Sequence, residues 1–173
     1  MLGNKSYKIY DDVFGISAQT RIFENLIHLN YFLGWSDRED KNNYRYLYSQ
    51  LDVEWLNYLN FFQNIENKNL YGVLENKNFS PNKVVVNVSV PGYFYVPHSH
   101  QSSYALVYYA NLEWDEHWAG ETIIYNGAGK ESNICIPYTP NRVLLLNKNI
   151  PHALRPPTFA APFYRFSISM FFD

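Results

Sequence analysis

The sequence has little cysteine and no excess of either charge. Cys135 is the single cysteine in 173 residues, so no disulfide can form within the chain. A reducing compartment fits this composition, and we expect a cytoplasmic location, or the host cytoplasm if the chain is viral. Acidic and basic side chains nearly balance, with a formal net charge of -2. Because no basic stripe stands out, we expect no nucleic-acid partner.

Long apolar runs are also missing. No segment approaches the run of about 20 apolar residues that spans a bilayer as a helix. Residues 1–10 contain no apolar stretch of the kind found in secretory signals. We therefore expect neither a membrane span nor a signal peptide, and we find no internal repeat.

The sequence is instead rich in hydrophobic and aromatic residues. Hydrophobic residues make up 47% of the chain, with 16 tyrosines and 12 phenylalanines. This length and composition suit a single domain over residues 1–173 with a sizeable core. The core should be aromatic, and buried tyrosine hydroxyls in it will need hydrogen-bond partners.

The pattern of apolar residues divides the chain near residue 80. Residues 17–34 place apolar side chains at helical spacing, with Ser17 as a candidate N-cap and Gly34 as the end. A second amphipathic helix is predicted over about 52–66. Residues 37–48 are polar and are predicted to be a loop, and 66–70 and 75–83 are predicted to be turns. Residues 1–80 thus form a helical support.

Residues 81–173 form the predicted β core. Short runs rich in Val, Ile, Tyr and Phe alternate with turns, a pattern typical of a sandwich or barrel. Helices followed by strands indicate an α+β, mainly β fold, in which the helices pack on the outer face of the sheet. The predicted strands lie within residues 83–90, 93–100, 103–111, 121–126, 132–138, 142–148 and 163–172.

Three of the five histidines could form a metal site. His98 and His100 lie two apart in a predicted strand, so their imidazoles should point to the same side. His152, in a proline-stiffened loop after an apolar strand, is the best third ligand. The alternative is an exposed pair at a strand end. His28 and His117 lie in amphipathic or polar segments and are interpreted as surface or packing residues.

The last predicted strand carries an arginine among apolar residues. Arg165, Ser167 and Ser169 share one face of this strand, and apolar residues occupy the other. A buried arginine needs an anionic partner, and a guanidinium beside a hydroxyl suits a carboxylate. The alternative is a structural salt bridge to one of the chain's own acids.

From about residue 84 onwards, the chain resembles the 2-oxoglutarate/Fe(II)-dependent oxygenases, most closely the prolyl-4-hydroxylase-like branch. The segment Pro-Gly-Tyr-Phe-Tyr-Val-Pro-His is similar to the lead-in to the first metal histidine of that branch. Four later segments resemble the branch in the same order. The five segments are residues 91–98, 105–115, 119–122, 141–152 and 165–167.

The resemblance implies a double-stranded β-helix, or jelly roll, with a catalytic Fe(II), 2-oxoglutarate as co-substrate and O2. His98 and His152 would be the proximal and distal ligands. Arg165, helped by Ser167 and Tyr109, would bind the distal carboxylate of 2-oxoglutarate. The implied reaction hydroxylates an unactivated C–H bond of a peptidyl, amino-acid or other small substrate and releases succinate and CO2. Ascorbate is an additional reductant that the resemblance allows.

The chain departs from the family pattern at His100, where the family usually has an aspartate. A third imidazole can still ligate Fe(II), but the site then lacks its anionic ligand. This keeps two alternatives open, a non-catalytic metal-binding β-helix domain and a three-histidine iron dioxygenase that needs no co-substrate. Residues 37–48 and 112–119 are the candidate loops at the barrel mouth. An alternative for 112–119 is a surface turn with Trp114 folded beneath it.

Overall fold

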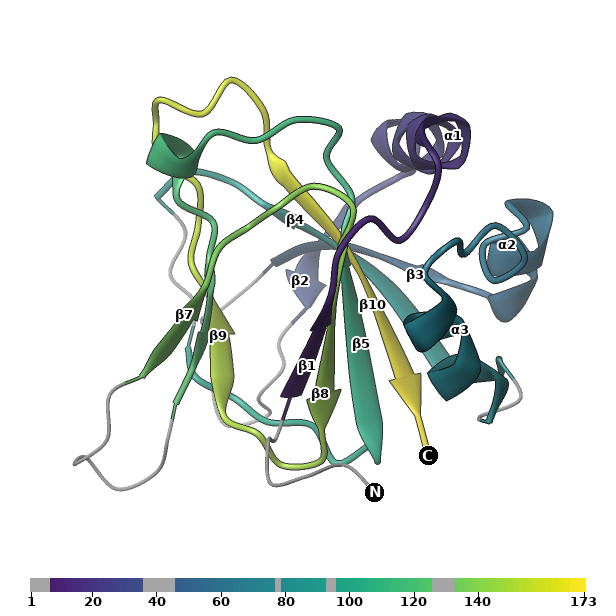
Figure 1. Ribbon diagram of the computed structural model, residues 1–173. Coiled ribbons are helices and arrows are strands. Elements are labelled where there is room, and N and C mark those ends of the chain that lie inside the picture. Colours follow the sequence, from purple (N-terminus) through teal and green to yellow (C-terminus); the bar gives the residue numbers. More distant parts are fainter. Residues whose placement is uncertain (1–6, 36–45, 77–78, 93–95, 126–132) are drawn as a thin grey trace.

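The computed structural model describes residues 7–35, 46–76, 79–92, 96–125 and 133–173. Two antiparallel sheets face each other in a double-stranded β-helix, as predicted (Figure 1). The larger sheet has the strand order β1-β8-β5-β10-β4-β3-β2, and the smaller has the order β7-β6-β9. The larger sheet consists of β1 (Tyr7–Tyr10), β2 (Phe32–Trp35), β3 (Tyr46–Leu51), β4 (Lys83–Ser89), β5 (Tyr104–Tyr109), β8 (Arg142–Asn147) and β10 (Arg165–Phe172). The smaller sheet consists of β6 (Thr122–Ile124), β7 (Ile134–Ile136) and β9 (His152–Leu154).

Alternation along the central strands divides the buried side chains between two cores. On β5, Leu106 and Tyr108 belong to the outer core, whereas Val107 and Tyr109 belong to the inner one. The inner core fills the space between the two sheets, and the polar residues of β10 point into that space. The period of two in the sequence therefore determines which residues of each central strand face the interior of the β-helix.

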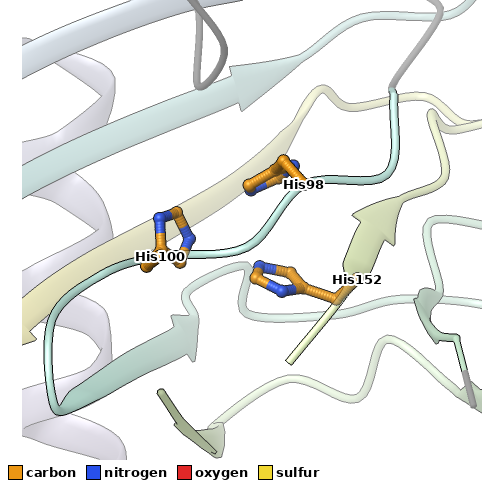
Figure 2. A group of neighbouring side chains, drawn as sticks. All are labelled: His98, His100 and His152. Atoms are coloured by element: carbon orange, nitrogen blue, oxygen red, sulfur yellow. The ribbon is translucent and has the colours of Figure 1, made fainter. Parts of the chain in front are cut away.

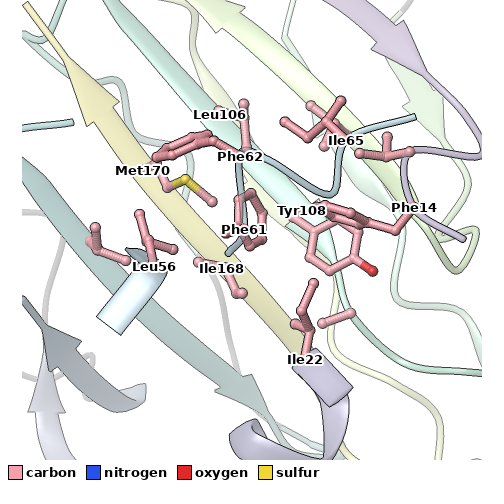
Figure 3. Close-up of a cluster of buried hydrophobic side chains, with 14 of the residues drawn as sticks. Phe14, Ile22, Leu56, Phe61, Phe62, Ile65, Leu106, Tyr108, Ile168 and Met170 are labelled. Atoms are coloured by element: carbon pink, nitrogen blue, oxygen red, sulfur yellow. The ribbon is translucent and has the colours of Figure 1, made fainter. Parts of the chain in front are cut away.

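Three helices cover the outer face of the larger sheet, the face on which the sequence predicted two helices to pack (Figures 1 and 3). Their apolar side chains pack against the outward residues of β5 and β10 and bury them. Ile22 and Leu56, for example, share one buried cluster with Ile168 and Met170. No helix in the described ranges is long and apolar enough to cross a bilayer. The helices are α1 (Ile16–Ile27), α2 (Val53–Tyr58) and α3 (Lys68–Glu75), with a short 3-10 helix, η1, at Glu116–Trp118.

The predicted helix over 17–34 is too long. It ends at Ile27, its N-cap is Gly15 rather than Ser17, and no side chain caps it. The chain then enters β2, because tertiary pairing with β3 overrides the local helical pattern. The predicted loop over 37–48 is wrong at its end, since residues 46–48 belong to β3; residues 37–45 lie outside the described part.

The predicted helix over 52–66 is also too long, and one helix was missed. Asn60 adopts a left-handed conformation, φ 49°, which ends the helical stretch, although Phe61 and Phe62 beyond it remain buried. Residues 68–75 form α3, although 66–70 and 75–83 were predicted to be turns; the helix begins where the Asn67 side chain accepts a hydrogen bond from Leu70 N–H at 3.1 Å. The first 80 residues therefore supply both helices and strands.

Candidate metal centre and anion site

Three histidines converge on the inner side of the β-helix. His98 and His100 come from the segment that leads into β5, and His152 is the first residue of β9 (Figure 2). One ring nitrogen from each lies within 4.8 Å of one from each of the other two. The ring centroids of His98 and His152 are 4.5 Å apart, and those of His98 and His100 are 4.9 Å apart. The sequence prediction that these three side chains meet is thus confirmed.

Backbone pairing fixes this arrangement. The N–H of His98 donates to the carbonyl of His152 at 3.0 Å, and the N–H of His152 donates back to His98 at 2.9 Å. The predicted strand over 93–100 is reduced to this isolated bridge within its described residues, 96–100. Conversely, the predicted loop around His152 is a strand, β9, because it pairs with β6.

Backbone carbonyls also select the tautomer of two rings. Nδ1 of His98 lies 3.1 Å from the carbonyl oxygen of Val96, and Nδ1 of His152 lies 2.9 Å from that of Ile150. A carbonyl oxygen only accepts hydrogen bonds, so each Nδ1 carries the proton and each Nε2 presents its lone pair. Orienting a metal-ligating histidine through its other nitrogen is the usual arrangement in metalloproteins.

Burial favours the neutral form of two of these imidazoles, His100 and His152. Desolvation, and then the neighbouring charge of His98, lowers the pKa of buried His152 to about 4. Desolvation, followed by the charges of His152 and His98, also holds the pKa of His100 well below its usual range. Neutral imidazoles with free lone pairs are the form that binds Fe(II), Zn(II) and other borderline cations. The donor set therefore fits a divalent transition metal.

Arg165 forms the second part of the site, at the start of β10. Its side chain is fully buried; Nε donates to the carbonyl of Gly120 at 2.8 Å and Nη1 to Ser167 Oγ at 3.3 Å. Nη2 is buried and has no hydrogen-bond partner in the described part of the chain. Among the described residues, no carboxylate forms an ion pair with Arg165. The alternative prediction, a structural salt bridge to one of the chain's own acids, is therefore not supported by these residues. A buried, unpaired guanidinium is a site prepared for an anion.

Tyr109 lies beside this guanidinium. Register places Tyr109 opposite Ser167, and the Arg165 guanidinium carbon is 5.1 Å from the Tyr109 ring centroid. The Tyr109 hydroxyl is 2.7 Å from Thr122 Oγ1. If Thr122 donates in this pair, the Tyr109 hydroxyl keeps its own proton for an anion. The structure therefore gathers Arg165, Ser167 and Tyr109, as predicted.

Three polar residues around Arg165 were not predicted. Thr122 and Asn111 are buried, and Tyr138 stacks on Tyr109 with ring centroids 4.6 Å apart. Alternation could have identified Tyr138, since it lies two positions after Ile136, which is inward and buried. Asn111 and Thr122 gave no such signal, because their contacts come from segments distant in sequence.

The two clusters lie along one strand of the larger sheet. Arg165 begins β10, and Phe171, near its other end, packs against His100 with ring centroids 4.8 Å apart. Between them the inner face carries Ser169, whose Oγ accepts a hydrogen bond from Asn87 Nδ2 at 3.3 Å. The interior of the β-helix therefore holds the three histidines near the Phe171 end of β10 and the Arg165 guanidinium near its beginning.

Residues 112–119 lie at the Arg165 end of the sheet, because they follow Tyr109, which pairs with Ser167. That they border the barrel mouth and select the substrate stays a prediction. Trp114 folds beneath this turn, as the alternative proposed, and its Nε1 donates to the carbonyl of Ala119 at 2.8 Å. His28 and His117 are exposed, as predicted.

The chain resembles solved structures in fold, although no family model matches it and a comparison with curated proteins found no significant match. A prolyl hydroxylase from Trichoplax adhaerens, in complex with a hypoxia inducible factor oxygen degradation domain peptide fragment, is 14% identical. That alignment covers 99% of this chain and 86% of the other, with a TM-score of 0.71. A Pseudomonas putida prolyl-4-hydroxylase is also 14% identical, covering 99% of this chain and 94% of its own, with a TM-score of 0.60.

A third similar structure is named as an epimerase and not as a hydroxylase. The epimerase SnoN, in complex with Fe3+, alpha ketoglutarate and nogalamycin RO, is 11% identical. The alignment covers 97% of this chain and 79% of SnoN, with a TM-score of 0.66. At these identities the comparisons show a shared fold, the double-stranded β-helix of 2-oxoglutarate/Fe(II) oxygenases.

Proposed function

We propose that this protein is an Fe(II)- and 2-oxoglutarate-dependent dioxygenase that hydroxylates an unactivated C–H bond. The observation that carries the proposal is Arg165, a buried guanidinium with one nitrogen unsatisfied among the described residues, in the same β-helix interior as three clustered imidazoles. A metal site alone has no use for such a cation. A ligand with an oxoacid head and a distal carboxylate would use both features, and 2-oxoglutarate has this form.

The residues would divide the binding as follows. His98, His100 and His152 would hold Fe(II) through ring nitrogens, and on His98 and His152 this nitrogen would be Nε2, because Nδ1 faces a backbone carbonyl. The guanidinium of Arg165 would pair with the distal carboxylate, and hydroxyls of Ser167 and Tyr109 would donate to it. When bound, iron, 2-oxoglutarate and O2 would supply the oxidising power, with succinate and CO2 as co-products. The protein's own contribution is to orient these groups and to exclude water.

The substrate would be a peptidyl or free amino-acid side chain or another small molecule. Structural neighbours support this breadth, since one was solved with a peptide fragment and another with nogalamycin RO. Ascorbate would serve as an auxiliary reductant. We propose a cytoplasmic location from the single, exposed Cys135.

His100 favours a second candidate. His100 occupies the position where the family usually has an aspartate. The three ligands are therefore all neutral donors, and, among the described residues, the site has no carboxylate ligand. A metal-binding domain without catalysis, or a three-histidine iron dioxygenase without co-substrate, would tolerate this. Neither would need a dicarboxylate anchor, so the unpaired Arg165 favours the first proposal.

The test is to load the purified protein with Fe(II) under anaerobic conditions and to add 2-oxoglutarate. A saturable visible charge-transfer band is expected, because 2-oxoglutarate would chelate the iron through its carboxylate and keto oxygens. If the protein binds stoichiometric metal but shows no charge-transfer band, the result would favour the second candidate function. A chain that binds no metal would contradict both.

A further inference from the structure

Asn111 and Tyr138 hold the backbone on both sides of Arg165. Asn111 Nδ2 donates to the carbonyl of Tyr164 at 2.9 Å, and Asn111 Oδ1 accepts from the N–H of Phe166 at 2.9 Å. The Tyr138 hydroxyl lies 2.6 Å from the carbonyl oxygen of Phe166 and 2.7 Å from Asn111 Oδ1. Neither side chain bonds to Arg165 itself, but together they fix the direction in which it leaves the strand.

The Tyr138 ring also contacts the guanidinium directly. The Arg165 guanidinium carbon is 4.6 Å from the Tyr138 ring centroid, closer than its 5.1 Å from the Tyr109 centroid. The Tyr109 and Tyr138 rings stack with an interplanar angle of 18°, and the Trp114 ring packs against Tyr138 with their centroids 4.6 Å apart. The aromatic stack, meaning Tyr109, Tyr138 and Trp114, therefore replaces water on this side of the guanidinium.

This packing matters because, among the described residues, the Arg165 guanidinium has two hydrogen-bond acceptors, the Gly120 carbonyl and the Ser167 hydroxyl. An arginine side chain has many rotamers, and a guanidinium free to reorient would lose both direction and affinity for a ligand. Cation–π contact holds the charged group without consuming its N–H donors. Nη2 is consequently left for the ligand.

We propose that Tyr138 is a positioning residue that sets the affinity of this protein for the distal carboxylate of its 2-oxoacid. The inference rests on the proposed function, because it concerns the same anion site. Tyr138 acts through Arg165, by fixing the backbone of Phe166 with its hydroxyl and by holding the guanidinium with its ring. Because only dicarboxylic 2-oxoacids have a distal carboxylate for the Arg165 guanidinium, this arrangement should make the protein bind them more tightly than monocarboxylic 2-oxoacids.

The experiment compares 2-oxoglutarate with pyruvate on the full-length Fe(II)-loaded protein, by anaerobic calorimetry. Pyruvate has the same oxoacid head but no distal carboxylate, so the ratio of the two dissociation constants isolates the contribution of Arg165. Tyr138→Leu should weaken 2-oxoglutarate binding about tenfold and pyruvate binding by less than about twofold. Tyr138→Phe, which keeps the ring and loses the hydroxyl, should fall between Tyr138→Leu and the unmodified protein.

Tyr108→Leu is the matched control. Tyr108 is also fully buried and adjoins Tyr109, but it faces the helices on the other side of the sheet. Tyr108→Leu should lower the melting temperature but leave the ratio of the 2-oxoglutarate and pyruvate dissociation constants unchanged. This is the result expected when the loss of a buried tyrosine affects only stability. A Tyr138→Leu protein that loses affinity for both 2-oxoacids equally would show that Tyr138 only stabilises the fold, and would overturn the inference.

Arg165→Met separates the inference from the proposed function. If the unmodified protein prefers 2-oxoglutarate and Arg165→Met loses this preference while Tyr138→Leu keeps it, Arg165 is the anchor and Tyr138 does not position it. If the unmodified protein binds both 2-oxoacids equally, Arg165 anchors no carboxylate, and both proposals fail. The expected result is loss of the preference in both variants, with little further loss in the double variant.

Discussion

His98 and His152 exchange both backbone hydrogen bonds of an antiparallel bridge, 3.0 and 2.9 Å long, while their rings lie 4.5 Å apart. Two candidate metal ligands are thus joined by the backbone itself and not by their side chains. The bridge should persist when either ring is removed, so metal binding and folding can be tested separately.

Removing either ring should abolish metal binding and spare the fold. His98→Ala and His152→Ala should contain no stoichiometric iron after loading, because two imidazoles are too few to hold the ion. The far-UV circular dichroism should match that of the unmodified protein. Metal content by atomic emission is the measurement, and His117→Ala, which changes an exposed histidine, is the control. Stoichiometric iron in both ligand variants would place the metal elsewhere.

Replacing His100 by a carboxylate should change which metal the site prefers. Imidazoles suit Zn(II) and Cu(II) as well as iron, whereas carboxylates suit harder ions such as Mn(II). His100→Asp, or the longer His100→Glu, should therefore raise the affinity for Mn(II) and Fe(II) relative to Zn(II). Competition dialysis against mixed metals measures this ratio. An unchanged ratio in both variants would mean that His100 does not ligate.

Arg165→Met should stabilise the protein without ligand and remove its response to 2-oxoglutarate. The variant removes the desolvation cost of a buried guanidinium without a counter-ion among the described residues, and this gain should offset the two hydrogen bonds lost to Gly120 and Ser167. Thermal melts with and without 2-oxoglutarate should show a melting temperature at least as high as that of the unmodified protein, and no ligand-induced rise. Arg165→Lys, which keeps the charge but not the fork, should recover only part of that rise. A full ligand-induced rise in Arg165→Met would contradict the anchor role.

Asn141 should contribute strongly to stability, because it ties the segment before α1 to β8. Its Oδ1 accepts from the N–H of Phe14 at 3.0 Å, and its Nδ2 donates to the Phe14 carbonyl at 2.8 Å, both buried. Asn141→Ala should lower the free energy of unfolding by about 2–4 kcal/mol, measured by urea denaturation. Asn149→Ala is the control, since Asn149 has nearly the same left-handed φ, 64° against 62°, but is exposed. If both variants lost the same free energy of unfolding, the left-handed backbone conformation and not the two side-chain hydrogen bonds would explain the effect.

The sequence predicted the central strands and the inward residues on them. Alternation in β10 correctly placed Arg165 and Ser167 on one face, and the family resemblance placed Tyr109 of β5 beside them. The same local rules failed at α1, α2 and α3. Short helices depend on tertiary burial for most of their stability, so periodicity gave the presence of α1 and α2 but not their bounds, and it missed α3.

The sequence by itself determined that His98 and His100 would lie close together and that Arg165 would be buried. Only the tertiary structure decided which residues complete each cluster. It paired the His98 and His152 backbones, and it brought Gly120, Asn111 and Tyr138 around Arg165. The physical reason is that spacing along one strand follows from backbone geometry, whereas contacts between strands depend on register and on the closure of both sheets, which are properties of the whole fold.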